Sequence, residues 1–210
     1  MIQIIPSINV LTFKEVKERI KQVEPFVLWC HLDVTDGVFS KHRTWNSPGD
    51  LISLDTQLNV EVHLMIEELE KVIDQWLVRP IKRVIIHLEA GKDIDGIIEK
   101  CKKAGIECGI AIRPDTSWNA FLPWVTKADM LQILAVNPGP SGQEMGPEIV
   151  DKISHLHNAC QECIIEVDGG VNPRTAALAR EAGAQVLVSG GYIFSQSDIH
   201  AGIKELQGSD

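Results

Sequence analysis

The sequence predicts a single (β/α)8 barrel that spans residues 1–210. Short, β-branched apolar runs alternate with amphipathic stretches along the whole chain, a pattern typical of repeated β/α units. The apolar runs are almost continuously hydrophobic, as are strands of a parallel sheet that is buried on both faces. Eight such runs fit a closed barrel, whereas a doubly wound open sheet, which is the alternative, usually has fewer strands.

The order of elements follows from these runs and from the residues that punctuate them. The predicted strands cover residues 2–7, 26–34, 59–65, 83–89, 107–112, 130–136, 163–168 and 186–189. The predicted helices lie between them, at residues 12–23, 69–77, 93–104, 147–158 and 173–182. Pro123 interrupts a further helical pattern near residues 118–126.

Residues typical of helix ends support these boundaries. Asn172 is a capping residue, and it is followed by Pro173 at the first helical position. Gly105 and Gly183 stand where a left-handed cap would end a helix. After a strand, Asp36 and the glycine that follows it indicate a turn.

The composition excludes several classes of partner. Hydrophobic residues make up 44% of the 210 residues and charged residues 23%, and the net charge of −9 disfavours a nucleic-acid surface. No apolar run approaches the roughly 20 residues that span a bilayer. The first residues carry no basic flank of the kind found in signal peptides. We therefore expect a cytoplasmic protein that binds a small molecule and neither nucleic acid nor a membrane.

The cysteines do not form the pattern of a disulfide framework. There are five of them, Cys30, Cys101, Cys108, Cys160 and Cys163. The last two form a CxxC motif with two histidines shortly before it, so a structural zinc site is one hypothesis. A second CxxC is missing from the sequence, and we expect free, reduced thiols.

Ionisable residues end three of the predicted strands. His31 and Asp33 share one face of a strand, because alternate residues point the same way. His63 ends the next strand, and Asp168 ends the seventh. The C-terminal strand ends of such a barrel form one face, so the four side chains predict a site for Zn²⁺, Fe²⁺, Mn²⁺ or Co²⁺. Asp33 and Asp168 also predict a pair of carboxylates for proton transfer.

Other polar residues stand at strand ends. His87 and Glu89 follow the fourth strand, where we expect hydrogen-bonded groups at the barrel mouth, with a lining role near the metal as the alternative. Glycine-rich loops at 137–143, 169–170 and 190–191 follow the last three strands. Glycine lets backbone N–H groups approach an anion, and the loops after strands seven and eight commonly bind phosphate in this fold.

Six motifs resemble those of one family. They are Ile5-Pro6-Ser7-Ile8, His31-Leu32-Asp33-Val34-x-Asp36-Gly37-x-Phe39, Val62-His63-Leu64-Met65, His87-Leu88-Glu89-Ala90, Val136-Asn137-Pro138-Gly139-x-x-Gly142-Gln143 and Glu166-Val167-Asp168-Gly169-Gly170-Val171. Together they resemble the ribulose-phosphate 3-epimerase family, and the similarity extends from residue 7 to residue 194.

The resemblance implies a ribulose-phosphate-binding TIM barrel with one divalent metal ion on His31, Asp33, His63 and Asp168. It implies conversion of D-ribulose 5-phosphate to D-xylulose 5-phosphate in the pentose phosphate pathway, with Asp33 and Asp168 transferring protons through a metal-stabilised enediolate. The residues that it assigns to substrate binding are Ser7, His63, Met65, Gly139, Pro140, Ser141, Gly142, Gly169, Gly170, Val171, Gly190 and Gly191. Assembly into a homo-oligomer is also implied.

The chain departs from the family pattern in the pocket wall. Family members usually carry Met at positions 35 and 135, where this chain has Thr35 and Ala135, so that only Met65 remains. Residues 40–47 also differ from the usual segment. Two alternatives therefore stay open: a 3-epimerase for another sugar phosphate, such as D-allulose 6-phosphate, or a weakly catalytic barrel that binds a phosphate ligand.

Overall fold

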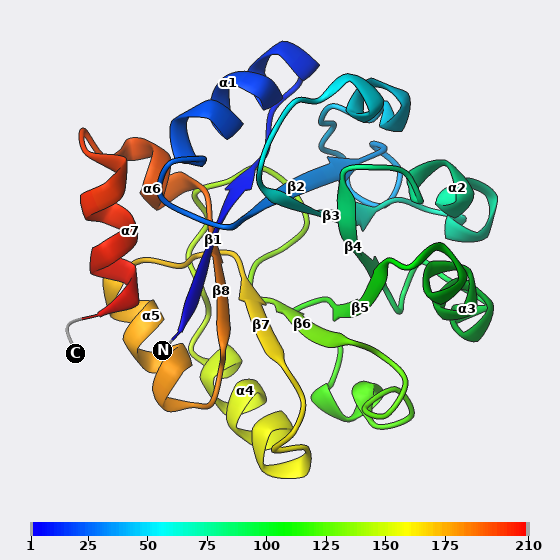
Figure 1. Ribbon diagram of the computed structural model, residues 1–210. Coiled ribbons are helices and arrows are strands. Elements are labelled where there is room, and N and C mark those ends of the chain that lie inside the picture. The colour runs from blue at the N-terminus through cyan, green and yellow to red at the C-terminus, as the bar shows by residue number, and fades with distance from the viewer. Residues whose placement is uncertain (1, 209–210) are drawn as a thin grey trace.

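The predicted strands close into one parallel barrel, which the computed structural model describes for residues 2–208 (Figure 1). The strands are β1 Gln3–Ile8, β2 Trp29–Thr35, β3 Asn59–Met65, β4 Ile81–His87, β5 Glu107–Ile112, β6 Met130–Leu134, β7 Ile165–Asp168 and β8 Val186–Ser189. Consecutive strands are neighbours, and β1 completes the ring by pairing with β8. The barrel is confirmed and the open sheet is excluded, because a closed ring has no edge strand.

Helices surround the barrel (Figure 1). They are α1 Phe13–Val23, α2 Leu69–Trp76, α3 Ile94–Ala104, α4 Glu148–Ala159, α5 Pro173–Glu181, α6 Gly191–Ser195 and α7 Ile199–Gln207, with the 3₁₀ helices η1 Pro48–Ser53 and η2 Trp118–Phe121. In α1 the buried residues Val16, Ile20 and Val23 recur at helical spacing, so one face packs on the barrel. Within residues 2–208, each helix is too short or too polar to cross a membrane.

The predicted helix ends are present. The side chain of Asn172 accepts hydrogen bonds from two backbone N–H groups in the first turn of α5, and Pro173 follows it. Gly105 and Gly183 have φ values of +69° and +110°, the left-handed region that glycine enters without steric cost.

Several predicted boundaries are wrong. Strand β2 begins at Trp29 and not at residue 26, since Phe26 and Leu28 are exposed and belong to the preceding loop. Strand β4 lies two residues earlier than predicted, and β6 ends at Leu134. The pattern near 118–126 forms only the short η2, because Pro123 has no N–H to continue the helix. Residues 191–195 and 199–207, where no helix was predicted, form α6 and α7.

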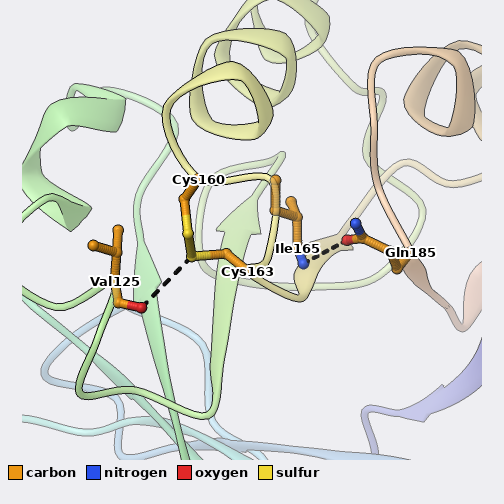
Figure 2. Close-up of a disulfide and its surroundings, with 5 residues drawn as sticks. All are labelled: Val125, Cys160, Cys163, Ile165 and Gln185. Carbon is orange, nitrogen blue, oxygen red and sulfur yellow. Dashed lines mark hydrogen bonds between the residues drawn. A yellow bond between two sulfur atoms is a disulfide. The ribbon is translucent and has the colours of Figure 1, made fainter.

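The CxxC motif forms a disulfide, so the expectation of free thiols at Cys160 and Cys163 is wrong (Figure 2). Their Cα atoms are 5.4 Å apart, within the range that a disulfide needs. The pair joins the end of α4 to the start of β7, where Ile165 N–H donates to the side chain of Gln185. The two sulfur atoms bond to each other and leave no thiolate for zinc. Cys30, Cys101 and Cys108 are free and buried, as expected.

The register of the strands brings the polar strand ends together. Asp33 is opposite His63 across β2 and β3, and Ser7 is opposite His31 across β1 and β2. All strands are parallel, so these residues lie at the same end of the barrel as Asp168.

Candidate active site

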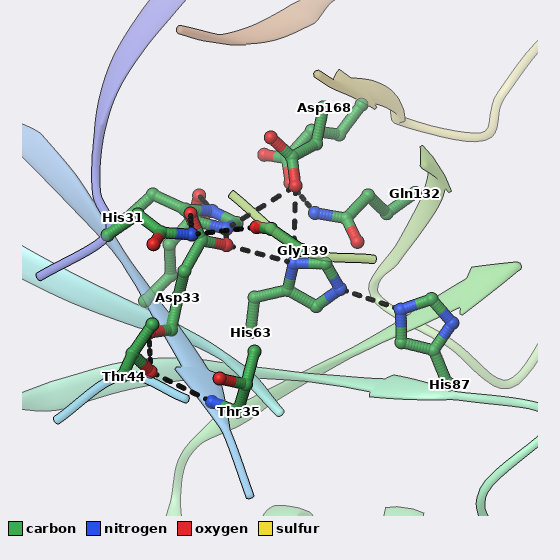
Figure 3. A network of polar contacts seen from close by, with 12 residues as sticks. His31, Asp33, Thr35, Thr44, His63, His87, Gln132, Gly139 and Asp168 are labelled. Carbon is green, nitrogen blue, oxygen red and sulfur yellow. Dashed lines mark hydrogen bonds and ion pairs between the residues drawn. The ribbon is translucent and has the colours of Figure 1, made fainter. Parts of the chain in front are cut away.

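Four ionisable side chains converge at the C-terminal end of the barrel (Figure 3). His31 Nε2 lies 3.3 Å from Asp33 Oδ1 and 3.8 Å from Asp168 Oδ2. His63 Nδ1 lies 3.4 Å from Asp33 Oδ1 and 3.2 Å from Asp168 Oδ2. One ligand atom from each residue lies within 4.8 Å of the others. The structure thus brings together the four residues expected to bind metal.

The donor atoms of this cluster suit a divalent metal ion. His31 Nε2 and His63 Nδ1 are buried, and neither forms a hydrogen bond of good geometry within residues 2–208. Buried polar atoms are normally paired, so two such nitrogens in one place are unusual. Two imidazole nitrogens and two carboxylates form a ligand set that Zn²⁺, Fe²⁺, Mn²⁺ and Co²⁺ all accept.

The carboxylates and imidazoles shift each other's pKa. Burial opposes the charge on His31, but hydrogen bonds and charges from the surrounding carboxylates outweigh it and raise the pKa of His31 well above its usual value. Burial also opposes the charge on Asp33, but His31 and His63 hold the pKa of Asp33 far below its usual value. The cluster therefore attracts cations, whether protons or a metal ion.

We expect the metal-free protein to lose free energy of unfolding as the pH rises beyond about 6.5, the ordinary pKa of histidine. The raised pKa of folded His31 gives a contribution that is complete below this pH and disappears as the pH passes the raised value. Urea unfolding with a chelator present, over about pH 6 to 9, measures the loss. The His31→Gln variant should show a flatter pH dependence, and an unchanged dependence would contradict this origin.

Two buried side chains, the carboxylate of Glu61 and the guanidinium of Arg83, hold the His31 ring in place. His31 Nδ1 donates to Glu61 Oε1 at 2.8 Å, and Arg83 donates to the other oxygen of Glu61 at 2.7 Å. Arg83 also contacts the half-exposed Glu107 at 2.7 Å. A carboxylate behind a metal-binding histidine fixes the ring orientation and the tautomer.

A second buried carboxyl lies next to this pair. Burial and the nearby charge of Glu61 raise the pKa of Glu166 well above its usual value, which favours the neutral form of this carboxyl. Gln132 donates to Glu166 Oε1 at 3.0 Å. The sequence patterns do not predict these roles for Glu61, Arg83, Gln132 or Glu166.

His87 lies behind His63 and not in the cavity. Its Nε2 is 2.8 Å from His63 Nε2 (Figure 3). Its Nδ1 is 3.1 Å from Glu89 Oε2. Burial lowers the pKa of His87 to about 4, although Glu89 acts in the opposite direction. Burial opposes the charge on Glu89, but hydrogen bonds from His87, Arg113 N–H and Thr116 lower the pKa of Glu89 to about 2. His87 and Glu89 are hydrogen-bonded groups, as expected.

A cavity of about 220 Å³ lies above the cluster. Asp33 and Asp168 line it, and so do all the residues expected to bind substrate except His63, which is buried beneath them: Ser7, Met65, Gly139, Pro140, Ser141, Gly142, Gly169, Gly170, Val171, Gly190 and Gly191. Asn9 and Asn172 also line the cavity, although neither was predicted from the sequence as a site residue. The structure shows where the residues expected to bind substrate lie, while their contacts with a substrate stay a prediction.

The unusual segment 40–47 lies beside Asp33, but neither it nor Thr35 or Ala135 lines the cavity, so the expectation of an altered pocket wall is wrong. Thr44 Oγ1 donates to the Asp33 carbonyl oxygen at 2.7 Å and accepts from the N–H of Thr35 at 2.9 Å. His42 Nε2 lies 2.8 Å from Asn9 Oδ1. Asn9 in turn donates to the Gly139 carbonyl oxygen at 3.2 Å, so this segment is connected to the loop after β6.

The loop after β7 has a backbone that only glycine adopts easily. Gly169 and Gly170 have φ values of +104° and +67°. A Cβ atom on Gly170 would lie 2.4 Å from the backbone nitrogen of Met145. The loops after β6 and β7 therefore touch each other at the cavity rim, and glycine permits the contact.

Three relatives illustrate what the chain resembles in sequence. It is 33% identical over 216 residues to the ribulose-phosphate 3-epimerase of Bacillus subtilis, with 100% of both chains covered. It is 33% identical to that of Chlamydia muridarum, with 81% of this chain and 78% of the relative covered. It is 34% identical to the chloroplastic ribulose-5-phosphate-3-epimerase of Arabidopsis thaliana, with 97% and 75% covered.

Solved structures with low sequence identity share the fold. A 3-hexulose-6-phosphate synthase superposes with a TM-score of 0.71 at 16% identity, over 99% of this chain and 98% of the other. A mutant tryptophan synthase α-subunit from Pyrococcus furiosus superposes with a TM-score of 0.73 at 8% identity, over the same shares. These similarities support the TIM barrel alone.

The family profile decides the relationship. A family model described as "Ribulose-phosphate 3 epimerase family" matches residues 3–194. These residues include every strand of the barrel and all four residues of the buried cluster. With full-length relatives at one-third identity, this match shows that the chain belongs to the ribulose-phosphate 3-epimerase family.

Proposed function

We propose that this enzyme inverts C3 of a ketose phosphate and that its substrate pair is D-ribulose 5-phosphate and D-xylulose 5-phosphate. The observation that carries the proposal is the position of Asp33 and Asp168 in one cavity, beside loops rich in glycine. Family membership and full-length relatives that are ribulose-phosphate 3-epimerases support the choice of pentose. This substrate would assign the enzyme to the pentose phosphate pathway.

The two carboxylates would act on opposite faces of C3. Asp33 belongs to β2 and Asp168 to β7, on two different sides of the barrel. One carboxylate removes the C3 proton from one face, and the other, as the acid, delivers a proton to the opposite face. After one turnover the first carboxyl is protonated and the second is ionised, which is the arrangement that the reverse reaction needs. Exchange of protons with solvent, or a reverse turnover, restores the starting state.

His31, Asp33, His63 and Asp168 would hold one divalent ion, Zn²⁺, Fe²⁺, Mn²⁺ or Co²⁺. When bound, it would polarise the C2 carbonyl and offset the negative charge that forms as the C3 proton leaves. Glu61 would keep the His31 ring in place throughout.

The glycine loops would hold the phosphate. The loops after β6, β7 and β8 line one side of the cavity, and backbone N–H groups of such loops bind anions. Because the net charge is −9, this local geometry must hold the substrate against the overall field of the protein.

We expect Gly170→Ala to raise KM and to lower stability more than Gly105→Ala does. Both glycines have φ near +70°, where alanine costs about 1–2 kcal/mol. A Cβ on Gly105 meets open space, whereas one on Gly170 meets the backbone of Met145, so only Gly170→Ala displaces a cavity loop. Urea unfolding and steady-state kinetics measure both effects. Equal KM values for the two variants would contradict the proposal that this loop binds the phosphate.

A six-carbon ketose phosphate, such as D-allulose 6-phosphate, is the second candidate substrate. The observation that favours it is a change beside the cavity: Thr35 and Ala135 stand where the family usually has methionine, and Thr44 contacts the Asp33 backbone. A barrel that only binds a phosphate ligand is less well supported, since both carboxylates are retained. The expected cytoplasmic location and homo-oligomeric assembly stay predictions.

Proton exchange in D₂O tests the proposal directly. The metal-loaded protein is incubated with ribulose 5-phosphate and with allulose 6-phosphate in parallel, and NMR follows deuterium entry at C3 and the epimer formed. Exchange of the pentose that chelation abolishes and metal restores would support the proposal. Exchange of the hexose alone would favour the six-carbon ketose phosphate as the substrate. Exchange of neither sugar would contradict both candidate substrates.

A further inference from the structure

We propose that Glu89 and His87 act as positioning residues that keep a hydrogen on His63 Nε2, so that the lone pair of His63 Nδ1 faces the buried cluster. Only the identity of the ion that uses this lone pair rests on the proposed function. The three side chains form a chain of contacts, with 2.8 Å between the Nε2 atoms of His63 and His87 and 3.1 Å between His87 Nδ1 and Glu89 Oε2. Both rings are completely buried.

The direction of these hydrogen bonds follows from Glu89. Its Oε1 accepts from the Arg113 N–H at 2.9 Å and from the Thr116 hydroxyl, which holds the carboxylate on the loop after β5. Oε2 remains as an acceptor for His87. Burial opposes the charge on Glu89, but its hydrogen bonds lower the pKa to about 2, so the carboxylate is ionised and can only accept. The hydrogen of this contact therefore belongs to His87 Nδ1.

A neutral imidazole has one donor and one acceptor nitrogen. With its hydrogen on Nδ1, His87 can only accept at Nε2, and therefore His63 must donate from its own Nε2. The ring centroids are 5.0 Å apart and the two Nε2 atoms are 2.8 Å apart. The two rings therefore meet edge to edge, as a hydrogen bond between their nitrogen atoms requires. His63 Nδ1 is left as the nitrogen that faces Asp33 and Asp168.

The packing around His87 prevents the ring from turning. The Phe39 ring lies against it, with centroids 4.7 Å apart, and the guanidinium of Arg113 covers the Phe39 ring at 3.9 Å. Arg113 also donates to the Phe39 carbonyl oxygen at 2.8 Å. The loop after β2 and the end of β5 thus hold His87 in place between them.

The two imidazoles of the cluster are supported differently. His31 donates directly to a carboxylate, that of Glu61, which Arg83 also contacts. His63 donates to the neutral ring of His87, which lies between His63 and Glu89. The sequence separation of His63, His87 and Glu89 gives no sign of this relay, which depends on the pairing of β3 with β4.

Nitrogen-15 NMR of the metal-free wild-type protein tests the assignment without any substrate. We expect His63 Nε2 and His87 Nδ1 to carry hydrogens, His87 Nε2 to be unprotonated, and a scalar coupling to connect the two Nε2 atoms across the hydrogen bond. A hydrogen on His87 Nε2 that points to an unprotonated His63 Nε2 would overturn the proposal.

Variants then measure the consequence for metal binding. His87→Leu removes the acceptor and should weaken Zn²⁺ binding about 10- to 100-fold, measured by competition with a chelator. His87→Gln retains an acceptor oxygen and should restore most of the affinity. His155→Leu, at an exposed histidine on α4, is the control, and circular dichroism checks that each variant is folded.

The outcomes separate this inference from the proposed function. Wild-type affinity in folded His87→Leu would overturn the relay and leave the epimerase proposal intact. Failure of the wild-type protein to bind Zn²⁺, Fe²⁺, Mn²⁺ or Co²⁺ would contradict the proposed cofactor, while the expected NMR assignment would still support the relay.

Discussion

Asp168→Asn and Asp33→Asn are each expected to lower kcat by about 100- to 10,000-fold, the usual contribution of a positioned acid or base. An amide cannot exchange protons with C3, although it fills nearly the same space. The two variants should also differ from each other. With saturating metal, each should still exchange the C3 hydrogen of the one epimer that its remaining carboxylate serves, and neither should complete the inversion.

Glu166→Gln is the matched control. Glu166 is two residues before Asp168 on the same strand and is also buried, and burial raises its pKa, which favours the neutral carboxyl. An amide there resembles the native carboxyl group, so kcat should change little. Steady-state kinetics and NMR in D₂O measure all three variants. A kcat near that of the wild type for either aspartate variant would exclude two-acid proton transfer.

Glu61→Leu is expected to lower the free energy of unfolding by about 3–5 kcal/mol, because removal of one member of a buried ion pair leaves its partner uncompensated. Arg83 would lose its contact at 2.7 Å, and His31 would lose the acceptor of its Nδ1 hydrogen. Zinc affinity should fall as well, since the His31 ring would no longer be held.

Glu107→Gln provides the comparison, because Glu107 also contacts Arg83 at 2.7 Å but its side chain is 48% exposed. Pairs of this kind contribute at most about 1 kcal/mol, so Glu107→Gln should remain close to the wild type. Urea unfolding at neutral pH measures both variants. Equal losses would mean that Arg83, and not the burial of Glu61, determines the stability of this pair.

The barrel and its cluster could be predicted because both depend on local patterns. Apolar runs separated by amphipathic stretches define the strands, and strand ends of a parallel barrel meet at one face whatever the details of packing. His31, Asp33, His63 and Asp168 each stand at such an end. The cavity residues in the glycine loops could be predicted for the same reason.

The polar groups beneath the cluster were missed, although the sequence contains a signal for some of them. Glu61 and Glu166 each lie two residues before a cluster residue, His63 and Asp168, so strand alternation places them on the same inward face. Arg83 needs the register between β3 and β4, which shifts next to Glu61. No local pattern could have revealed that shift.

Other features depend on contacts between distant segments. Asn9 and His42 meet because two loops fold over the barrel mouth, and loop conformation has no periodicity to read. The CxxC spacing was compatible with a disulfide, with zinc and with free thiols, and only the bond between the two sulfur atoms decided among them. Strand boundaries at residues 26–28 and 83–89 failed because hydrophobicity alone does not show where pairing stops.

The position of His63 has a consequence for the reversibility of the proposed reaction. Its Nδ1 atom lies 3.4 Å from the Asp33 carboxylate and 3.2 Å from the Asp168 carboxylate, so one imidazole faces both acids at nearly the same distance. Under the proposed reaction the two carboxylates exchange the roles of acid and base, and this shared neighbour favours neither assignment of the roles. The same site would therefore serve both directions, and, as for any catalyst, the equilibrium constant and the concentrations of the two sugars would determine which way the carbon flows.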